Sequence, residues 1–167
     1  MALSLEKRKP SRLSSYDYSQ NGAYFLTICI KDMRCILWNA RSPLPSSADD
    51  SSHLSDIGLA ADEAIRAISL HYPSVTVEKY TVMPNHLHMI LLLSENHAVP
   101  APDISRIVQQ MKSAVTKRVG HPVWQKSFHD HIIRSEKEFL AIWEYIDANP
   151  VRWREDCYYA EDGLFIP

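Results

Sequence analysis

The sequence has no apolar run that approaches the roughly 18–20 residues needed to cross a bilayer, and no apolar segment follows its basic N-terminus. We therefore expect neither a membrane-spanning helix nor a secretory signal. The three cysteines are odd in number, and none of them forms a Cys-x-x-Cys pair. This pattern disfavours a disulfide framework and a cysteine-ligated zinc, so we expect a reducing, cytoplasmic environment.

The formal net charge is also small, −2, and gives no global sign of a nucleic-acid ligand. Its distribution is uneven. Residues 104–134 carry six Lys or Arg side chains against Asp130 alone, whereas residues 49–63 hold five acids and no Lys or Arg. A basic surface set off by acidic segments fits a polyanionic ligand, and it equally fits a set of solvated helix faces. Charge alone does not decide between the two.

A chain of 167 residues with 46% hydrophobic content is sufficient for one domain with a real core. Hydrophobic patterning predicts strands at 23–30, 34–38, 75–82, 86–93 and 123–133, and helices at about 55–69, 103–118 and 136–149. This order predicts the α+β class, with a ferredoxin-like (RRM-like) antiparallel sheet, helices on one face and a further C-terminal helix. We expect one domain over 1–167, with a basic arm at 1–20, a flexible loop at 40–53 and an acidic tail at 154–167.

The segment 81–93, TVMPNHLHMILLL, contains a turn followed by a strand that begins with two histidines. Side chains alternate along a strand, so His86 and His88 share one face while Leu87 points to the other. The unbroken apolar run that follows predicts a central strand buried on both sides. Two imidazoles there provide half of a metal site, or two structural histidines with ordinary hydrogen bonds.

The last predicted helix carries a second polar pair. Tyr145 and Asn149 are four residues apart, so they are neighbours on one flank of the helix beside its apolar stripe. Two imidazoles and an amide oxygen can hold a divalent cation, and a tyrosine beside that cation is a candidate nucleophile. The alternative is a half-buried aromatic residue and a C-terminal cap. Pro150 follows Asn149 and disfavours helical geometry there, so we expect the amide to be held at the end of the helix.

The ordered combination of MPNHLH and YIDANP resembles the HUH single-tyrosine transposases of the insertion-sequence-200 group, and most closely the REP-associated tyrosine transposases. The segments RKPSRLSSYDYSQNGAYFLTI, ISRIVQQMKSAVTKRVG and VWQKSFHDHIIRSEKEF extend the resemblance over residues 7–153. It implies a domain that cleaves and rejoins single-stranded DNA through a covalent 5′-phosphotyrosine. Tyr145 would be the nucleophile, and His86, His88 and Asn149 would bind Mg²⁺ or Mn²⁺.

The resemblance also implies hairpin DNA from a palindromic repeat as the partner, with homodimer and monomer both open. Basic side chains would hold phosphates, while amide and ring side chains would contact bases. The residues that we expect to contact DNA are Arg12, Gln109, Lys112, Lys117, Arg118, Trp124, Lys126, His129 and His131.

Several alternatives stay open at this point. His129 and His131 form a second His-x-His pair, and Tyr158 and Tyr159 are other candidate nucleophiles, although they lie in an acidic segment where a phosphate is disfavoured. Two other functions compete with the transposase. One is a catalytically silent nucleic-acid-binding module on the same fold, and the other is a metal-dependent phosphodiesterase that uses water.

Overall fold

The computed structural model describes residues 21–40, 42–47, 49–94 and 102–159. The predicted basic arm, which includes Arg12, and residues 160–167 of the predicted tail lie outside this part. Four strands form one antiparallel sheet in the order β2-β3-β1-β4, where β1 is Gly22–Cys29, β2 is Val75–Val82, β3 is His86–Leu93 and β4 is His129–Ile133. This order is that of a ferredoxin-like sheet, so the predicted fold class is confirmed.

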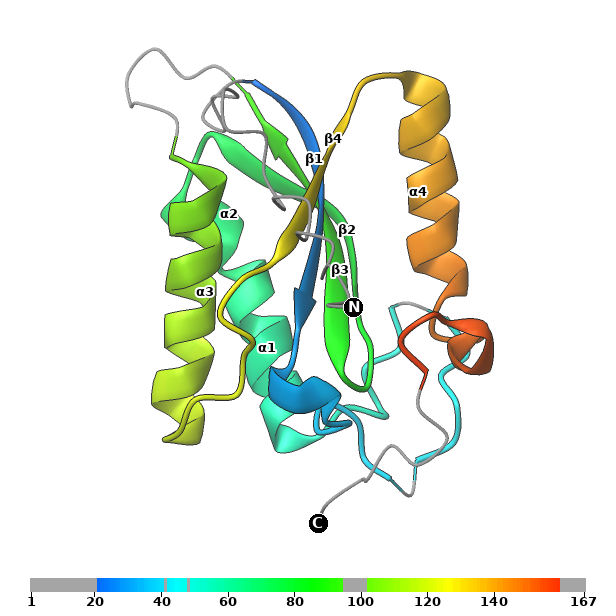
Figure 1. Ribbon diagram of the computed structural model, residues 1–167. Helices are drawn as coiled ribbons and strands as arrows, with labels where there is room; N and C mark the ends of the chain where they lie inside the picture. The colour runs from blue at the N-terminus through cyan, green and yellow to red at the C-terminus, as the bar shows by residue number, and fades with distance from the viewer. Residues whose placement is uncertain (1–20, 41, 48, 95–101, 160–167) are drawn as a thin grey trace, which may run out of the picture.

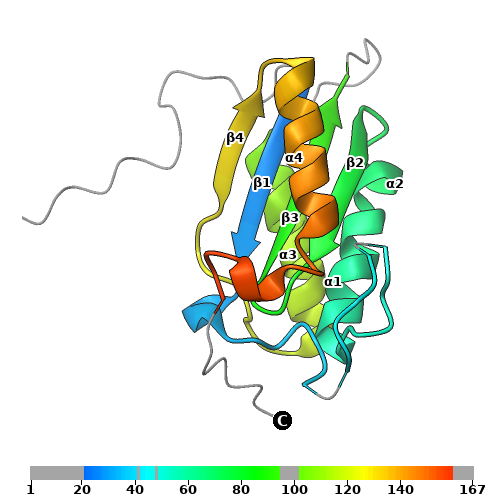
Figure 2. The ribbon, with the colours of Figure 1, turned by 90° about the vertical axis from the view of Figure 1, so that its right-hand side faces the viewer.

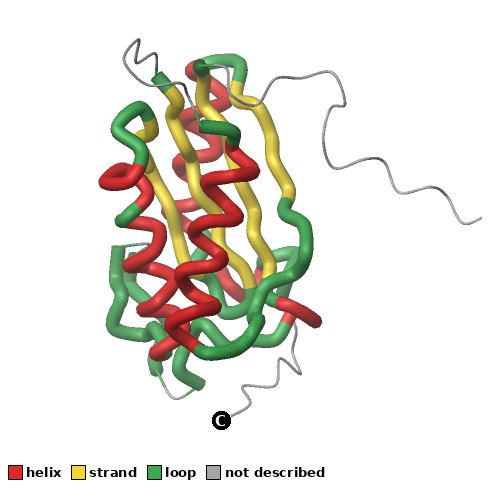
Figure 3. The backbone as a smooth tube through the Cα atoms, turned by 90° about the vertical axis from the view of Figure 1, so that its left-hand side faces the viewer, coloured by secondary structure: helices red, strands yellow, loops and turns green. Residues whose placement is uncertain are grey.

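Helices cover both faces of the sheet, but unequally. The helices α1 (Asp56–Arg66), α2 (Ile68–His71) and α3 (Ile104–Val119) lie on one face, and α4 (Glu136–Ala148) lies alone on the other (Figures 1 and 2). Figure 3 shows the helical layer in front of the strands. Two short 3-10 helices, η1 (Lys31–Met33) and η2 (Trp153–Glu155), flank the lower end of the sheet in Figure 1.

Serine residues begin two of the helices, as their capping chemistry predicts. The hydroxyl of Ser55 accepts from the N–H of Gly58 at the start of α1, and Ser135 does the same for Glu138 at the start of α4. The helix predicted over 55–69 is divided at Ala67 into α1 and α2. None of the described helices is long and apolar enough to cross a membrane.

The strand β3 is central and buried on both faces, as its continuous apolar run predicts. Its odd-numbered residues from Leu87 to Leu93 belong to the large core beneath α1 and α3. On the other face, Ile90 joins Ile133 and Ile146 in a much smaller cluster under α4. The face that carries His86 and His88 is therefore covered mainly by one helix and the chain that follows it.

One predicted strand is absent, and another is shorter than predicted. Residues 34–38 form no strand, because η1 turns the chain first and Trp38 then makes a single bridge to Leu54. The strand predicted over 123–133 begins only at His129, and Trp124 forms an isolated bridge to Ile30. Between the Trp124 bridge and the start of β4, the ammonium group of Lys112 donates hydrogen bonds to the carbonyls of residues 125 and 127. These bonds replace the sheet hydrogen bonds that this segment lacks.

Candidate active site

The turn before β3 fixes where the two histidines begin. The carbonyl of Asn85 accepts a hydrogen bond of 2.8 Å from the N–H of Ile30, just beyond the end of β1. From this point the side chains alternate, so His86 and His88 face α4 while Leu87 enters the opposite core. The two imidazole rings lie with their centroids 4.6 Å apart.

Asn85 determines the tautomer of His86. Its amide nitrogen donates to the carbonyl of Tyr158 at 2.9 Å and to that of Met33 at 3.4 Å. The amide oxygen is therefore the atom that lies 2.8 Å from Nδ1 of His86. Because a carbonyl oxygen can only accept, Nδ1 of His86 carries the hydrogen and its Nε2 carries the lone pair.

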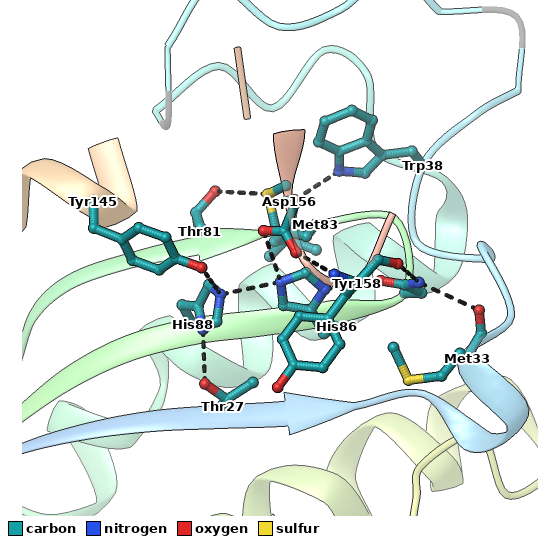
Figure 4. A network of polar contacts seen from close by, with 12 residues as sticks. Thr27, Met33, Trp38, Thr81, Met83, His86, His88, Tyr145, Asp156 and Tyr158 are labelled. Carbon is teal, nitrogen blue, oxygen red and sulfur yellow. Dashed lines mark hydrogen bonds and ion pairs between the residues drawn. The ribbon is translucent and has the colours of Figure 1, made fainter. Parts of the chain in front are cut away.

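His88 is held by a threonine from the neighbouring strand. The Oγ1 of Thr27 lies 2.8 Å from Nδ1 of His88, and a hydroxyl can either donate or accept there. The Nε2 atoms of His86 and His88 lie 3.1 Å apart (Figure 4). Burial lowers the pKa of both imidazoles to about 3, so both are neutral at pH 7.

This pair has the geometry of two cis ligands to one cation. Two nitrogens that are each about 2.1 Å from an ion, at a right angle, would lie about 3.0 Å apart. The side chain of Asp156 is fully buried beside them, with Oδ2 3.9 Å from Nε2 of His86 and without a hydrogen-bond partner. One ligand atom from each of the three residues falls within 4.8 Å of the others, the only such His/Cys/Asp/Glu group among the described residues. A buried, unpaired carboxylate oxygen beside two neutral imidazoles fits a divalent cation.

Sequence reasoning missed Asp156, which it placed in the acidic tail. The residue follows η2, where the chain after α4 turns back across the lower end of the sheet (Figure 2). Trp153 is buried in the same turn, with its ring centroid 6.1 Å from that of His86. A tryptophan between charged residues is the one local sign that this segment packs against the domain.

Tyr145 points its hydroxyl at the imidazole pair (Figure 4). Its Oη lies 3.3 Å from Nε2 of His88, and its ring packs edge-on against Phe25. Partial burial, together with the negative charge of Asp156, raises the pKa of Tyr145 to about 12, while a contact with the Asn149 side chain acts in the opposite direction. At neutral pH the side chain is therefore a phenol, and attack by its oxygen requires loss of the proton.

Asn149 lies directly after α4 and is buried. The predicted position at the end of the helix is confirmed, because Asn149 is the C-cap of α4, although its φ of −60° and ψ of −44° are still helical in spite of Pro150. Its N–H bonds to the carbonyl of Tyr145 at 3.0 Å, and this continuation of the helix keeps both side chains on one flank. The amide nitrogen of its side chain has no hydrogen-bond partner among the described residues. Its role as a metal ligand stays a prediction.

A cavity of about 440 Å³ opens beside the tyrosine. The residues that line it include Tyr145, Asn149, Arg152, Glu155 and Asp156. Arg152, which sequence reasoning did not single out, is exposed. An arginine in this position can bind a phosphate group next to the tyrosine.

The second His-x-His pair lies on the same face of the sheet as His86 and His88 but outside the His86–His88–Asp156 group. His129 and His131 are opposite Thr27 and Phe25 in the β1–β4 register, so their side chains face the α4 side. Both are exposed, and Nε2 of His131 lies 2.6 Å from a carboxylate oxygen of Glu138. These two histidines border the site without joining the three-residue group.

Tyr158 packs against the site without presenting its hydroxyl to it. Its ring centroid is 4.6 Å from that of His86, and burial raises its pKa to about 12. In Figure 4 its hydroxyl points away from the two facing nitrogens, whereas that of Tyr145 points toward them.

The other residues predicted to contact DNA lie across the sheet from Tyr145. They belong to α3 and to the chain that follows it, which Figure 1 shows on the side opposite α4. Arg118 is paired with Glu63 of α1, whereas Gln109, Lys117 and Lys126 are exposed. The structure therefore divides the predicted DNA-binding residues between the two faces.

No protein-family profile matches the chain. A Haemophilus influenzae protein described as "Uncharacterized protein" is 30% identical over 179 residues, which cover 94% of this chain and 96% of the relative. A "Putative REP-associated tyrosine transposase" from the same organism is 26% identical over 153 residues, 84% of this chain and 77% of that protein. A "REP-associated tyrosine transposase" of Escherichia coli is 31% identical over 77 residues, 46% of this chain and 44% of its own length.

The fold is shared with a solved structure described as a REP-associated tyrosine transposase bound to a REP hairpin. The two superpose with a TM-score of 0.60 at 26% sequence identity, and the match covers 84% of this chain and 74% of the other. The two relatives described as REP-associated tyrosine transposases and this structural neighbour thus agree with each other and with the MPNHLH and YIDANP motifs. The chain belongs to the REP-associated tyrosine transposase family.

Proposed function

We propose that this protein is a metal-dependent enzyme that cleaves and rejoins single-stranded DNA through a covalent 5′-phosphotyrosine on Tyr145. One observation carries the proposal. The Tyr145 hydroxyl lies 3.3 Å from Nε2 of His88, beside the buried group formed by His86, His88 and Asp156. A nucleophile next to a cluster that can hold a cation is an arrangement that favours attack on a phosphodiester.

His86 and His88 would hold the ion through Nε2, with the amide oxygen of Asn149 and Oδ2 of Asp156 as oxygen ligands. Six-coordinate Mg²⁺ or Mn²⁺ accepts such a set and leaves positions for phosphate oxygens. When bound, the ion would withdraw charge from a non-bridging oxygen of the scissile phosphate and lower the barrier to attack.

In the cleavage step, Oη of Tyr145 forms a bond to phosphorus while the bond from phosphorus to the 3′ oxygen breaks. The phenol loses one proton and the 3′ oxygen gains one, so the step consumes neither water nor a nucleotide. Because the pKa of Tyr145 is about 12, the phenol must lose its proton before or during the attack. Tyr145 is 43% exposed, so water can carry that proton to the leaving oxygen. Attack of a 3′-hydroxyl on the phosphotyrosine reverses the step and rejoins strands.

The partner that we propose is hairpin DNA, since the related solved structure is described as bound to a REP hairpin. Near the tyrosine, Arg152 would bind a phosphate next to the cleaved bond. His129 and His131, exposed on the same face, would contact the strand that leaves the site.

The test is an incubation of DNA hairpins with Mg²⁺ or Mn²⁺, followed by a denaturing gel. The DNA is labelled at its 3′ end, because the fragment on the 3′ side of the break is the one that stays attached to the protein. Wild type and Tyr158→Phe should form a labelled adduct, whereas Tyr145→Phe, or wild type in EDTA, should form none. An adduct that persists in Tyr145→Phe would exclude Tyr145 as the nucleophile.

The same gel separates the two competing functions. Shortened DNA that carries no protein would indicate a phosphodiesterase that uses water. Binding of the hairpin by wild type on a native gel, with neither adduct nor shortened DNA, would indicate a catalytically silent binding module.

A further inference from the structure

A β-bulge in β2 places a lysine beneath α4. In the β2–β3 register Val77 is opposite Leu91, and both side chains pack in the large core beneath α1 and α3. Lys79 is opposite Ile90, which belongs to the small cluster under α4, so residue 78 is an extra residue in β2. Because residues two apart on a regular strand share a face, Lys79 would lie in the large core without the bulge. The bulge instead turns its side chain toward α4.

The ammonium group of Lys79 binds the helix. Only 11% of the Lys79 side chain is exposed, and its Nζ lies 2.7 Å from a carboxylate oxygen of Asp147, a half-exposed residue of α4. The same Nζ is 5.4 Å from the ring centroid of Trp143, also on α4. The carboxylate of Asp49 is 3.7 Å away, but its side chain is 85% exposed. An ammonium with so little water around it needs a close anion, and Asp147 supplies one.

This ion pair lies on the opposite flank of α4 from the tyrosine. Ile146 is fully buried and points at the sheet. At about 100° per residue, Tyr145 and Asp147 lie on the two sides of Ile146, each about 100° from it. Figure 2 shows α4 in front of the central strands, with β2 on one side and β4 on the other. Asp147 is bound to β2, whereas Tyr145 packs edge-on against Phe25 of β1.

The apolar packing under α4 does little to fix the rotation of the helix about its own axis. The cluster is small, and apolar attraction has no direction, so it resists lifting of the helix more than rotation. Near the N-terminal end of α4, Glu138 pairs with His131 of β4 at 2.6 Å. Near the C-terminal end the Lys79 pair holds the other edge of the sheet. The two ion pairs thus bind opposite flanks of the helix.

We propose that Lys79 is a positioning residue for the nucleophile. Its ion pair with Asp147 fixes the rotation of α4 and thereby holds the Tyr145 hydroxyl beside His88. A rotation of about 10° moves an atom at the helix's outer radius, roughly 5–6 Å, by about 1 Å. A misplacement of that size at a reacting atom can slow a reaction roughly a hundredfold. The inference rests on the proposed function in that Tyr145 is the attacking group.

The test compares the two carboxylates that lie near the same ammonium. Lys79→Met keeps the length of the side chain without its charge, and Asp147→Asn removes the carboxylate on α4. Asp49→Asn is the matched control, because it removes the other acid near Lys79 and leaves α4 unchanged. The probe is a 3′-labelled hairpin that wild type selects from a randomised pool. Its Kd is measured by anisotropy, and the rate constant for adduct formation is measured with Mn²⁺ at saturating protein.

Lys79→Met and Asp147→Asn should each slow adduct formation roughly ten- to a hundredfold, with a Kd close to that of wild type. The double variant should be no slower than either single variant, because both substitutions remove the same interaction. Lys79→Arg, which keeps a cation under the helix, should restore most of the rate, and Asp49→Asn should react as wild type. Because Asp147 is half exposed, Asp147→Asn provides the test even if Lys79→Met fails to fold.

Two results would overturn the proposal. One is a rate for Asp147→Asn that equals that of Asp49→Asn. The other is a double variant whose loss of rate is the product of the two single losses, since independent effects multiply. A purely structural role would lower the unfolding midpoint of the variants and leave the rate constant at saturating protein unchanged.

A measurement on the metal-free protein without DNA separates this inference from the proposed function. The rings of Tyr145 and Phe25, with centroids 6.3 Å apart, should give nuclear Overhauser contacts that are assigned with Tyr145→Phe. These contacts should weaken in Lys79→Met and Asp147→Asn and persist in Asp49→Asn. That pattern without any adduct in wild type would retain Lys79 as the residue that positions Tyr145 and exclude Tyr145 as the nucleophile. An adduct in wild type, with contacts and rates unchanged in the variants, would exclude the positioning role alone.

Discussion

Thr27 and His88 are directly opposite each other in the β1–β3 register, and the threonine Oγ1 lies 2.8 Å from Nδ1 of the imidazole. Strand pairing thus places a hydroxyl where it can accept the Nδ1 hydrogen and leave Nε2 free for a cation. On the other edge of β3, Thr81 is also opposite His88, but its hydroxyl lies 4.0 Å from the sulfur of Met83. The same histidine therefore has one threonine that orients it and one that does not.

We predict that Thr27→Val weakens Mn²⁺ binding by roughly ten- to a hundredfold, the usual effect of removing a group that orients a ligating histidine. Titration calorimetry on the purified protein would measure it. Thr81→Val is the matched control, because it removes a hydroxyl from the other neighbour of His88 and should leave the affinity close to that of wild type. Equal losses in the two variants would mean that packing around β3, rather than the Thr27 hydrogen bond, controls the affinity.

Asp156→Asn should also weaken Mn²⁺ binding by at least tenfold. The substitution keeps the shape of the side chain and removes the negative charge, and a buried site has little solvent to compensate for that loss. Glu155→Gln removes a charge from the preceding residue, which lines the neighbouring cavity but is not part of the His–His–Asp group, and should change the affinity less than threefold. Unchanged binding in Asp156→Asn would restrict the metal site to His86, His88 and Asn149.

The buried histidines should make the metal-free protein sensitive to acid. Burial lowers the pKa of His86 and His88 to about 3, whereas an imidazole in the unfolded chain titrates near 6.5. Below pH 6.5 the unfolded chain binds protons that the folded chain does not, so stability falls as the pH falls from 6.5 toward 3. Each of the two contributes a slope of at most about 1.4 kcal/mol per pH unit in that window.

Urea unfolding in EDTA between pH 7 and 4 would measure this slope. His88→Gln should reduce it by removing one of the two groups, although the variant starts from a lower stability at pH 7. His121→Gln, at an exposed position after α3, should keep the slope of wild type. A slope that is the same in all three proteins would assign the acid sensitivity to carboxyl groups instead.

Much of the fold could be predicted because it depends on patterns within single segments. The bounds predicted for β2 and β3 agree with the structure. Both strands follow from runs of β-branched and apolar residues, and the Pro84–Asn85 turn separates the two runs. The predicted start of the strand over 123–133 was wrong, because the alternation of apolar and polar residues continues through residues that leave the sheet. Only a contact from another element, the Lys112 ammonium on two carbonyls, stabilises that departure.

Some residues of the candidate site could likewise be predicted from patterns within one segment, and others could not. His86 and His88 could be paired from their spacing on one strand, and Tyr145 could be placed on the flank of a helix by its period. Asp156 could not be placed near them, because its position depends on a turn in the chain after α4. The orienting role of Asn85 was equally hidden, since it depends on carbonyls that distant residues supply.

A final prediction concerns Gly58, in the first turn of α1. A Cβ added there would lie well inside 3.0 Å of the carbonyl oxygen of Leu37, a backbone atom that cannot move aside cheaply. Leu37 also donates its N–H to the carbonyl of Pro84, in the turn that leads into His86. Gly58→Ala should therefore reduce the free energy of unfolding by about 3 kcal/mol and also weaken Mn²⁺ binding.

Urea unfolding and calorimetry, with Gly120→Ala as the control, would separate these two effects. Gly120 ends α3 with a φ of +88°, and a Cβ there would meet nothing within 4 Å, so alanine would cost only the backbone strain of about 1–2 kcal/mol. Because Gly120 lies after α3, on the opposite side of the sheet from the histidines, its substitution should leave Mn²⁺ affinity unchanged. If both variants lose stability equally and neither loses affinity, the approach of Leu37 to α1 does not position the turn before His86.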